Sequence, residues 1–433
     1  MKKLMWGTGV VSLLIWGISL LLLPENTNMD IWFWRKQLIY VTGVASFAYM
    51  SLIMLLAIRP KWLENPLNGL DKMYRLHKWA GIWAISLGVV HYLIKLSKDI
   101  LILYVERGAK GPREDWFLDI FRGAAKDLGE WAVYFSIAML VITLWKKFPY
   151  DKWRIIHKSL SAFFLVIVFH GVVLSPSEWW LQPIGMFMAV CSLLGSYCAV
   201  IAIFGRIGAQ RRFSGKVESV EQLANGIVEI TCNLGKNWHH TQGQFAFIKH
   251  TALGEQHPFT ISSADKHDGR VRFAIKSLGD DTTLLYHSVK VGDKVEVEGP
   301  YGCFSYNENS QTEQLWVAAG IGVTPFIAWL EGLQEQPEKA PKVTLHYCAN
   351  NEQEGVYAKR LQALTETIDN ITLVIHYSEQ EGYLTADKLL QGTAQNTPIW
   401  FCGPSGFAKA IKTGMQKAGR DLALFHNEYF EIR

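Results

Sequence analysis

The sequence predicts a bundle of six membrane-spanning α-helices fused to an antiparallel β-barrel and then to a parallel α/β sheet. Runs of roughly 20 mostly apolar residues crowd the first half of the chain, and each can cross a hydrocarbon core of about 30 Å as a helix. Beyond about residue 210, short alternating segments bounded by Gly, Asn and Asp are typical of an antiparallel barrel. From about residue 314, strands alternate with helical segments, as in a parallel sheet. We therefore expect domains at 1–208, 209–308 and 309–433.

The composition fits a membrane protein and argues against several other classes. Of the 433 residues, 49% are hydrophobic and only 19% are charged, so the lipid bilayer is the expected partner of the first half. The net charge of +4 includes no basic run long enough to indicate nucleic acid as a partner. The six cysteines are scattered without a C-x-x-C or C-x-x-C-H pattern, which argues against structural zinc, an iron–sulfur cluster and covalent haem. Any haem would be held noncovalently.

The basic residues of the short loops predict the orientation of the bundle. The six helices are expected at 4–23, 37–58, 74–96, 129–146, 154–174 and 183–204. Lys and Arg gather at the N-terminus, between helices two and three, between helices four and five, and after helix six. All of these fall on one side, so the positive-inside rule predicts a multi-pass protein of the cell membrane with both termini in the cytoplasm. The long outer segment 97–128 is expected to contain a short amphipathic helix around Trp116–Phe121.

Four histidines are the chemically distinctive feature of the first half. His77 and His91 lie fourteen residues apart on the third helix, and His157 and His170 lie thirteen apart on the fifth. Either spacing spans roughly 20 Å along a helix. Ionisable residues inside a membrane are costly and usually functional. We interpret the four as ligands of two b-type haems stacked across the membrane. A proton relay and a metal transport path remain open alternatives, although both usually recruit Asp or Glu as well.

The spacing of the histidines alone supports haem binding better for the third helix than for the fifth. At 100° per residue, fourteen residues return to within about 40° of the starting face, whereas thirteen miss it by about 140°. Either the fifth helix is distorted, or two haems approach it from different sides. Trp83 and Phe163 each follow the inner histidine of their helix by six residues, so both are expected at mid-depth between the haems, where core packing is the favoured role.

Three motifs in the second half indicate nucleotide binding. One, AAGIGVTPF, follows a strand and opens a helix, where small residues let the backbone approach a pyrophosphate and the helix N-terminus favours negative charge. Alone, this pattern also fits an ordinary tight turn. Another, FCGPSG, ends a later strand at the edge where open α/β sheets bind ligands. The last, HPFTISSA at 257–264, offers hydroxyl and backbone groups to a ring with carbonyl and imine edges.

Together these motifs resemble two known superfamilies. HPFTISSA, GPYG (299–302), AAGIGVTPF, FCGPSG and the terminal EYFEIR resemble the ferredoxin–NADP reductase superfamily. The four-histidine membrane domain resembles the ferric reductase and NADPH oxidase superfamily. The resemblance covers nearly the whole chain, which is similar to the single-chain prokaryotic NADPH oxidases. It implies FAD, two haem b groups, and NADPH and/or NADH as cofactors.

The resemblance also assigns roles to individual residues. His77 with His157 would bind the inner haem, and His91 with His170 the outer haem, while Phe163 matches an inter-haem aromatic. The flavin-binding residues would be His257, Pro258, Phe259, Thr260, Lys276, Gly279, Thr282 and Thr283, with Thr260 near the reactive edge. The nucleotide-binding residues would be Gly320, Gly322, Thr324, Pro325, Cys402, Gly403, Pro404 and Ser405. Cys402 would lie beside the nicotinamide, and Phe430 would stack on the flavin, with Tyr429 as the alternative. Thr260, Cys402 and Phe430 are thus the expected catalytic residues.

The chain departs from the resemblance where coenzymes are distinguished. HYCANNEQEG carries Ala349, Asn350 and Asn351 where NADPH-specific members often place Arg or Ser. An Asp or Glu that would bind a free 2′-hydroxyl is also missing at the strand tip, so coenzyme preference is open. The sequence contains no EF-hand loop or Pro-rich segment, and no obligate protein subunit is implied.

The implied activity is a transmembrane NAD(P)H oxidase. Electrons from cytosolic NAD(P)H would pass through FAD and two haems to oxygen at the outer face, giving superoxide. Arg35 and Lys36, near the outer end of helix two, are expected mainly as a solvated flank. Two alternatives stay open. One is a ferric-chelate reductase with the same electron path, and the other is a membrane electron carrier that feeds quinone or a periplasmic protein.

Overall fold

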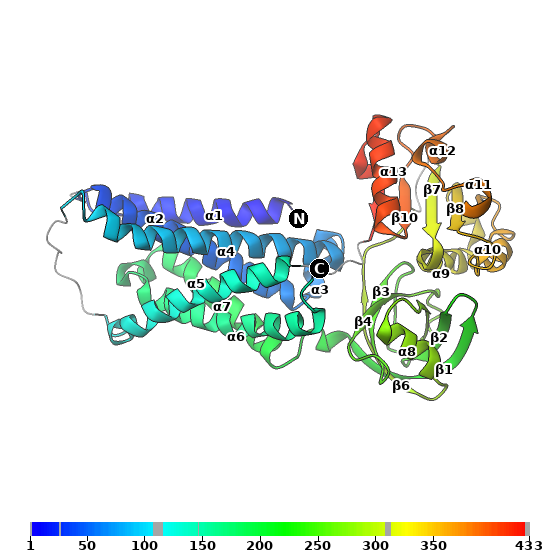
Figure 1. Cartoon of the computed structure of the whole chain (residues 1–433), viewed down its shortest axis with the longest axis horizontal. Coiled ribbons are helices and arrows are strands. Elements are labelled where there is room, and N and C mark those ends of the chain that lie inside the picture. The colour runs from blue at the N-terminus through cyan, green and yellow to red at the C-terminus, as the bar shows by residue number, and fades with distance from the viewer. Residues whose placement is uncertain (1, 26, 107–115, 146, 308–312, 429–433) are drawn as a thin grey trace. The chain divides into compact units, whose positions relative to one another are not determined.

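The computed structural model describes residues 2–25, 27–106, 116–145, 147–307 and 313–428. The chain forms two compact units, one covering the described residues up to Ile207 and the other starting at Gly208. The first is helical, and the second contains both β-sheets (Figure 1).

Over its described residues, the helical unit contains six helices that are long and apolar enough to cross a membrane, which confirms the predicted fold class. They are α1 (Lys2–Leu21), α2 (Ile31–Ala57), α4 (Leu70–Leu101), α5 (Arg122–Leu144), α6 (Tyr150–Leu174) and α7 (Pro183–Ile203). The short helix α3 (Lys61–Leu67) precedes α4. Four helices begin several residues before their predicted starts: α2, α4, α5 and α6. The expected amphipathic helix around Trp116–Phe121 is a single 3₁₀ turn, Asp119–Phe121, that leads into α5.

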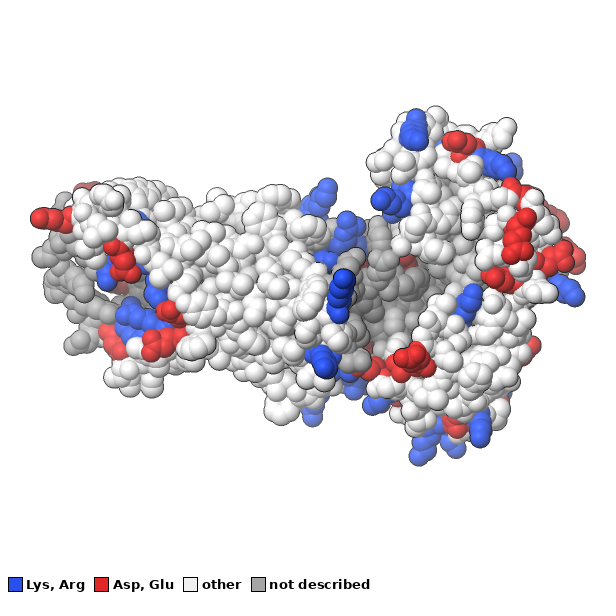
Figure 2. All heavy atoms as spheres, in the orientation of Figure 1, with Lys and Arg blue, Asp and Glu red and all other residues white. Residues whose placement is uncertain are grey.

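The exterior of this unit is apolar, as a lipid-facing surface requires. Leu14, Trp131 and Leu193 are 62%, 70% and 74% exposed, an arrangement that water would disfavour. On the face shown in Figure 2, the central stretch of the bundle carries no charged side chains, which gather at its two ends. Inside, α2 contacts α1, α4, α6 and α7, and its buried face includes Phe47 and Met54.

The second unit begins with a six-stranded antiparallel sheet in the order β4-β3-β6-β1-β2-β5. Its strands are β1 (Arg212–Leu223), β2 (Ile227–Asn233), β3 (Phe245–Lys249), β4 (His257–Thr260), β5 (Arg270–Lys276) and β6 (Lys294–Tyr301). Between β5 and β6 lies α8 (Asp280–Ser288). The two edges of the sheet meet through one isolated bridge between Ile261 and Phe273, so the predicted barrel is present but not closed by a full ladder.

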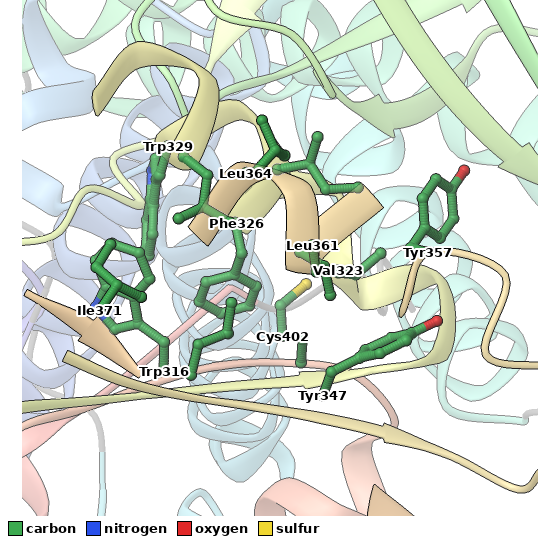
Figure 3. Packing of buried hydrophobic residues seen from close by; sticks show 14 of the residues in the cluster. Trp316, Val323, Phe326, Trp329, Tyr347, Tyr357, Leu361, Leu364, Ile371 and Cys402 are labelled. Atoms are coloured by element: carbon green, nitrogen blue, oxygen red, sulfur yellow. The ribbon is translucent and has the colours of Figure 1, made fainter. Parts of the chain in front are cut away.

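A five-stranded parallel sheet follows, in the order β11-β10-β7-β8-β9, as predicted. Its strands are β7 (Gln314–Ala319), β8 (Val343–Ala349), β9 (Ile371–Tyr377), β10 (Ile399–Cys402) and β11 (Phe425–Asn427). Its helices are α9 (Thr324–Leu333), α10 (Ala358–Thr365), α11 (Ser378–Glu381), α12 (Ala386–Leu390) and α13 (Ser405–Lys417). Trp316, Phe326 and Trp329 pack against one another in the core between β7 and α9 (Figure 3).

A buried ionic network joins the two sheets of the second unit. Glu229 of β2 accepts hydrogen bonds from Arg360 of α10 (3.1 Å) and from the Tyr357 hydroxyl (3.0 Å). Glu331 of α9 accepts from Arg360 (2.7 Å) and from Arg272 of β5 (2.6 Å). Removing one member of such a buried network leaves an uncompensated charge, which is strongly destabilising. The network therefore fixes strands of one sheet against helices that cover the other.

Candidate functional site

The four membrane histidines form two facing pairs. His77 of α4 lies opposite His157 of α6, with ring centroids 6.1 Å apart and planes at 61°. His91 lies opposite His170, with centroids 6.3 Å apart and planes at 76°. Two imidazoles that bind opposite sides of one metal ion at about 2 Å would place their centroids roughly 6 Å apart. Both pairs therefore have the separation required of two axial ligands to one haem iron.

The thirteen-residue spacing on α6 does not prevent this pairing. The helix is continuous from Tyr150 to Leu174, so the distorted-helix alternative does not apply. His157 and His170 leave α6 on different sides and still meet partners on α4. The pairs in space are those expected from the resemblance, and haem binding itself stays a prediction.

Backbone carbonyls set the tautomer of three of these histidines. The Nδ1 atoms of His77, His91 and His170 lie 3.1, 2.9 and 2.8 Å from the carbonyl oxygens of Ile53, Ile39 and Ala125. A carbonyl only accepts, so each Nδ1 carries the hydrogen and each Nε2 keeps its lone pair. Metal-bound histidines are normally oriented in this way.

The fourth histidine, His157, is held differently. Its Nδ1 is buried and has no hydrogen-bond partner among the described residues, and its ring stacks on Trp153 at 4.8 Å and 26°. Stacking fixes the plane of the ring but not its tautomer.

A cavity of about 500 Å³ surrounds His91 and His170. Its volume lies within the range of roughly 300–1,000 Å³ that is usual for ligand sites. The basic side chains that line it are Arg35, Lys36, Lys95, Arg122 and Lys126. The acidic lining residue Glu130 is bound by Lys95 at 2.7 Å and by the Tyr92 hydroxyl at 2.7 Å. An apolar, histidine-flanked space with a cationic end fits an iron porphyrin, whose two propionates are anionic.

Two glycines let the outer histidines occupy this cavity. A Cβ at Gly129 of α5 would overlap the His170 ring, and a Cβ at Gly43 of α2 would lie 3.0 Å from His91 Nδ1. Both residues line the cavity. Neither glycine belongs to a motif that is recognisable in the sequence. The available signal was a glycine inside an apolar helix, which costs about 1 kcal/mol relative to alanine and therefore needs a packing reason.

Of the two aromatic residues expected at mid-depth, Trp83 lies on the exterior of the helix bundle and Phe163 packs against a neighbouring helix. Trp83 is 41% exposed and contacts Trp6 of α1, so it lies on the outside of the bundle and not between the histidine pairs. Its helical phase points it away from His77 and His91. Phe163 packs on Phe135 of α5 at 4.4 Å, in keeping with a core-packing role.

In the second unit, a cavity of about 1,020 Å³ brings both nucleotide motifs and the flavin motif together. The predicted residues that line it are Pro258, Phe259, Thr260, Lys276, Thr282, Gly320, Gly322, Thr324, Cys402, Gly403 and Pro404. The predicted residues outside its lining are His257, Gly279, Thr283, Pro325 and Ser405. Phe430 and Tyr429 lie outside the described residues. The volume, at the upper end of the usual range, suits two nucleotides better than one.

Predicted residues outside the cavity lining support those that line it. The His257 ring stacks on Phe259 at 6.3 Å and 18°, and its Nε2 lies 3.3 Å from Asp281. The backbone N–H of Gly279 donates to the Thr282 hydroxyl at 3.1 Å at the start of α8. These contacts hold β4 and the first turn of α8 in place beside the cavity.

The loop between β7 and α9 has the geometry of a phosphate-binding turn. Gly320 has φ +55°, which a side chain would disfavour, and α9 begins at Thr324. A Cβ at Gly322 would overlap the carbonyl of Cys402, so only glycine permits this close approach to the FCGPSG loop. Thr324 donates its N–H to the Ile321 carbonyl and Pro325 has no N–H, so a phosphate would approach the backbone at the Gly320–Val323 turn and not at the first residues of α9.

Cys402, at the end of β10, is buried beside these glycines. Burial raises the pKa of its thiol far above the usual range. The side chain is therefore a neutral thiol at physiological pH. It provides a small, polarisable contact and not a nucleophile.

An acidic residue that the sequence analysis missed lies at the far end of the cavity. Glu354 lines it together with Asn350 and Ser378. Asn350 donates to Glu354 at 3.0 Å, and its side-chain oxygen lies 3.1 Å from the Ser378 hydroxyl. Glu354 is five residues beyond the end of β8 and returns to the strand tip only because the intervening loop folds back. Because Glu354 lies five residues beyond the strand, the sequence alone does not place it at the strand tip, where a residue that binds the ribose is expected.

A buried histidine pair beside the cavity predicts a pH-dependent stability. His346 and His376 stack at 5.2 Å, with Nδ1 and Nε2 2.9 Å apart. Burial, helped by the neighbouring His376, lowers the pKa of His346 to about 4. Below pH 6.5 the unfolded chain binds a proton at His346 that the folded chain does not. The contribution of His346 to the free energy of unfolding is therefore fully present above pH 6.5 and is lost as the pH falls towards 4. The full loss amounts to roughly 3 kcal/mol.

We therefore expect His346→Gln to flatten the fall in unfolding temperature between pH 6.5 and 4. The measurement is thermal unfolding of the full chain, followed by release of flavin fluorescence. His287→Gln, at an exposed position on α8, is the control and should keep the wild-type slope. An unchanged slope in His346→Gln would show that other groups set the acid limit.

Three family models match successive parts of the chain. A ferric reductase like transmembrane component matches residues 42–168, an FAD-binding domain matches 212–305, and an oxidoreductase NAD-binding domain matches 316–413. Their order is that of the helical unit, the antiparallel sheet and the parallel sheet.

Individual relatives agree with these matches. The chain is 26% identical over 299 residues to ferric reductase transmembrane component 3 of Saccharomyces cerevisiae, covering 66% of this chain and 39% of that one. It is 27% identical over 234 residues to the toluate 1,2-dioxygenase electron transfer component of Pseudomonas putida, covering 51% and 68%. A solved flavohaem-like FAD/NAD binding domain of nitric oxide dioxygenase from Vibrio cholerae O1 biovar El Tor has a TM-score of 0.43, 21% identity, and coverage of 50% and 97%. The chain spans less than two thirds of several of the curated relatives it matches.

A membrane helix bundle joined to flavin and nicotinamide nucleotide domains defines a transmembrane NAD(P)H-dependent flavin oxidoreductase. Its helical unit matches the ferric reductase like transmembrane component family, and its second unit matches an FAD-binding domain followed by an oxidoreductase NAD-binding domain.

Proposed function

We propose that the protein is an NAD(P)H oxidase that carries electrons from cytosolic NAD(P)H through FAD and two b haems to oxygen, giving superoxide at the outer face of the cell membrane. The proposal rests on the two facing histidine pairs, His77 with His157 and His91 with His170. Their members on α4, His77 and His91, are fourteen residues apart. When bound, FAD accepts a hydride and releases single electrons, and the haems carry them across the membrane. Basic loops on one side of the bundle support a cytoplasmic position for both termini and the second unit.

The chain's own residues have separate tasks in this proposal. The Nε2 atoms of the two histidines in each pair would hold one haem between them, and the haems would supply one-electron transfer to oxygen. The cationic side chains of the 500 Å³ cavity hold the propionates. In the second unit, Thr260 would contact the flavin edge and Lys276 and Thr282 would contact its phosphates, while Gly322 allows the two dinucleotide loops to lie close together. Phe430 would cover the flavin on the side where nicotinamide enters.

The test is superoxide production by the purified protein supplied with FAD, haem and NAD(P)H. We expect cytochrome c reduction that superoxide dismutase suppresses and that stops without oxygen. Cytochrome c reduction that is insensitive to superoxide dismutase and unchanged under anaerobic conditions would contradict the oxidase assignment.

A ferric-chelate reductase is the second candidate, and the basic lining of the outer cavity favours it. Five cationic side chains against one paired carboxylate would attract an anionic ferric chelate as readily as they hold propionates. Anaerobic turnover with ferric citrate distinguishes the two. Rapid anaerobic iron reduction with little superoxide in air would replace the oxidase proposal by this one.

We further propose that NADH is the preferred coenzyme. The Glu354 carboxylate would accept a hydrogen bond from a free 2′-hydroxyl and would repel a 2′-phosphate. Glu354→Gln is expected to improve the ratio of kcat/KM for NADPH to that for NADH by about 10-fold, or roughly 1.4 kcal/mol. Steady-state kinetics of both coenzymes checks this.

Glu352→Gln is the matched control for this change. Glu352 lies in the same loop but is exposed and does not line the cavity, so its loss should leave the ratio within about 2-fold. Equal shifts in both variants would indicate a general charge effect and no specific contact with the ribose.

A further inference from the structure

Three side chains of the second unit converge on one point away from the nucleotide cavity. His239 Nδ1 lies 3.2 Å from Asp265 Oδ2, His267 Nδ1 lies 3.5 Å from the same oxygen, and the two Nδ1 atoms are 3.2 Å apart. None of the three lines the 1,020 Å³ cavity. The group is also distinct from the four membrane histidines.

Hydrogen bonds alone do not account for this triangle. If both Nδ1 atoms carried hydrogens for the carboxylate, two N–H donors would face each other at 3.2 Å. If one Nδ1 were unprotonated, its lone pair would face the lone pairs of Asp265 at 3.2 or 3.5 Å. A cation at the centre would satisfy three lone pairs at once.

The edges of the triangle match tetrahedral metal coordination. Zinc binds imidazole nitrogen at about 2.0–2.1 Å and carboxylate oxygen at about 2.0–2.2 Å, which sets ligand-to-ligand distances of roughly 3.3–3.5 Å in a tetrahedron. The observed edges are 3.2, 3.2 and 3.5 Å. Two histidines and one carboxylate are also a common ligand set for divalent first-row metals.

The surrounding contacts hold the carboxylate ready for a metal. The Asp265 side chain is 7% exposed, and its oxygens accept from the backbone N–H groups of His267 (2.8 Å) and His240 (3.2 Å). Such outer contacts orient metal ligands and raise affinity. The side chains of His239 and His267 are 56% and 77% exposed, which leaves room for a water molecule as a fourth ligand.

We propose that His239, Asp265 and His267 bind one divalent transition-metal ion of the zinc class, with water completing the tetrahedron. The ion would tie the loop after β2 to the segment that follows β4. Asp265 is five residues beyond Thr260, so metal binding would stabilise the end of the flavin-binding strand. The proposal does not depend on the electron acceptor, because the site lies outside the electron path.

Zinc and cobalt binding to the full-length protein test the proposal. The protein is purified in detergent without a polyhistidine tag, stripped with EDTA and titrated with Zn²⁺ and with Co²⁺ as a spectroscopic probe. We expect one equivalent of Zn²⁺, counted apart from haem iron by mass spectrometry, and the visible absorption of four-coordinate Co²⁺ displaced by Zn²⁺. His239→Ala and His267→Ala should each weaken binding by at least about 10-fold.

His287→Ala provides the matched control, because this exposed histidine on α8 is remote from the triangle in sequence and should bind metal as wild type does. Flavin content and elution volume show whether each variant is folded. Wild-type protein that takes up no stoichiometric Zn²⁺, or gives six-coordinate Co²⁺ spectra, would overturn the proposal without any variant. So would binding that survives in both His239→Ala and His267→Ala.

Discussion

Replacing His91 with alanine is expected to reduce the haem content from two per chain to one. His91 is placed by its Nδ1–H bond to the Ile39 carbonyl and faces His170 across 6.3 Å, so its loss leaves one axial ligand for that iron. The His77–His157 pair does not contact this cavity and should keep its haem. Electron delivery to the outer acceptor should fall at least ~100-fold, because roughly 20 Å of the path loses its carrier. Reduction of the flavin by NAD(P)H should be unchanged.

The measurement is a reduced-minus-oxidised spectrum with haem quantitation. Trp83→Ala is the matched control, since Trp83 is on the same helix but contacts Trp6 on the exterior of the helix bundle. It should retain two haems. An unchanged haem content in His91→Ala would overturn the pairing of His91 with His170.

Much of the fold could be predicted because its determinants are local. An apolar run of membrane length and an alternating strand are visible in a short window of sequence. The start of α2 was missed because Arg35 and Lys36 interrupt the apolar run. Its signal was Asp30, whose side chain accepts the N–H of Phe33 at 2.8 Å and caps the helix. Arg35 in turn donates to the Lys95 carbonyl of α4, so the charges sit at the bundle's end.

The site was predicted where residues share a motif and missed where folding alone brings them together. The histidines and glycine loops carry chemistry that is recognisable by residue type. Gly129 is meaningful only because α5 passes close to His170, and Glu354 only because its loop folds back to the tip of β8. The metal site was missed for a related reason. Zinc sites are recognised in a sequence by closely spaced Cys and His residues, whereas His239 and His267 are 28 residues apart.

Gly322→Val is expected to weaken NAD(P)H binding while leaving the flavin in place. Its first side-chain atom would overlap the Cys402 carbonyl, so the β7–α9 loop and the FCGPSG loop must separate. Overpacking of this kind costs about 1–3 kcal/mol, which corresponds to a rise in the Kd for NAD(P)H of roughly 10- to 100-fold. The flavin residues on β4 are in a different sheet and keep their own contacts with β3.

Stopped-flow reduction of bound flavin by NADH measures this effect directly. Gly406→Ala is the control, because Gly406 lies in the first turn of α13 and an added Cβ would meet nothing within 4 Å. Dithionite should still reduce the haems of Gly322→Val, since the electron path beyond the flavin is untouched. A variant that keeps wild-type affinity for NADH would mean that the close approach of the two loops is not required for binding. If flavin were lost together with NADH affinity, the two nucleotide subsites would share their support, and the separation of roles between β4 and the glycine loops would be wrong.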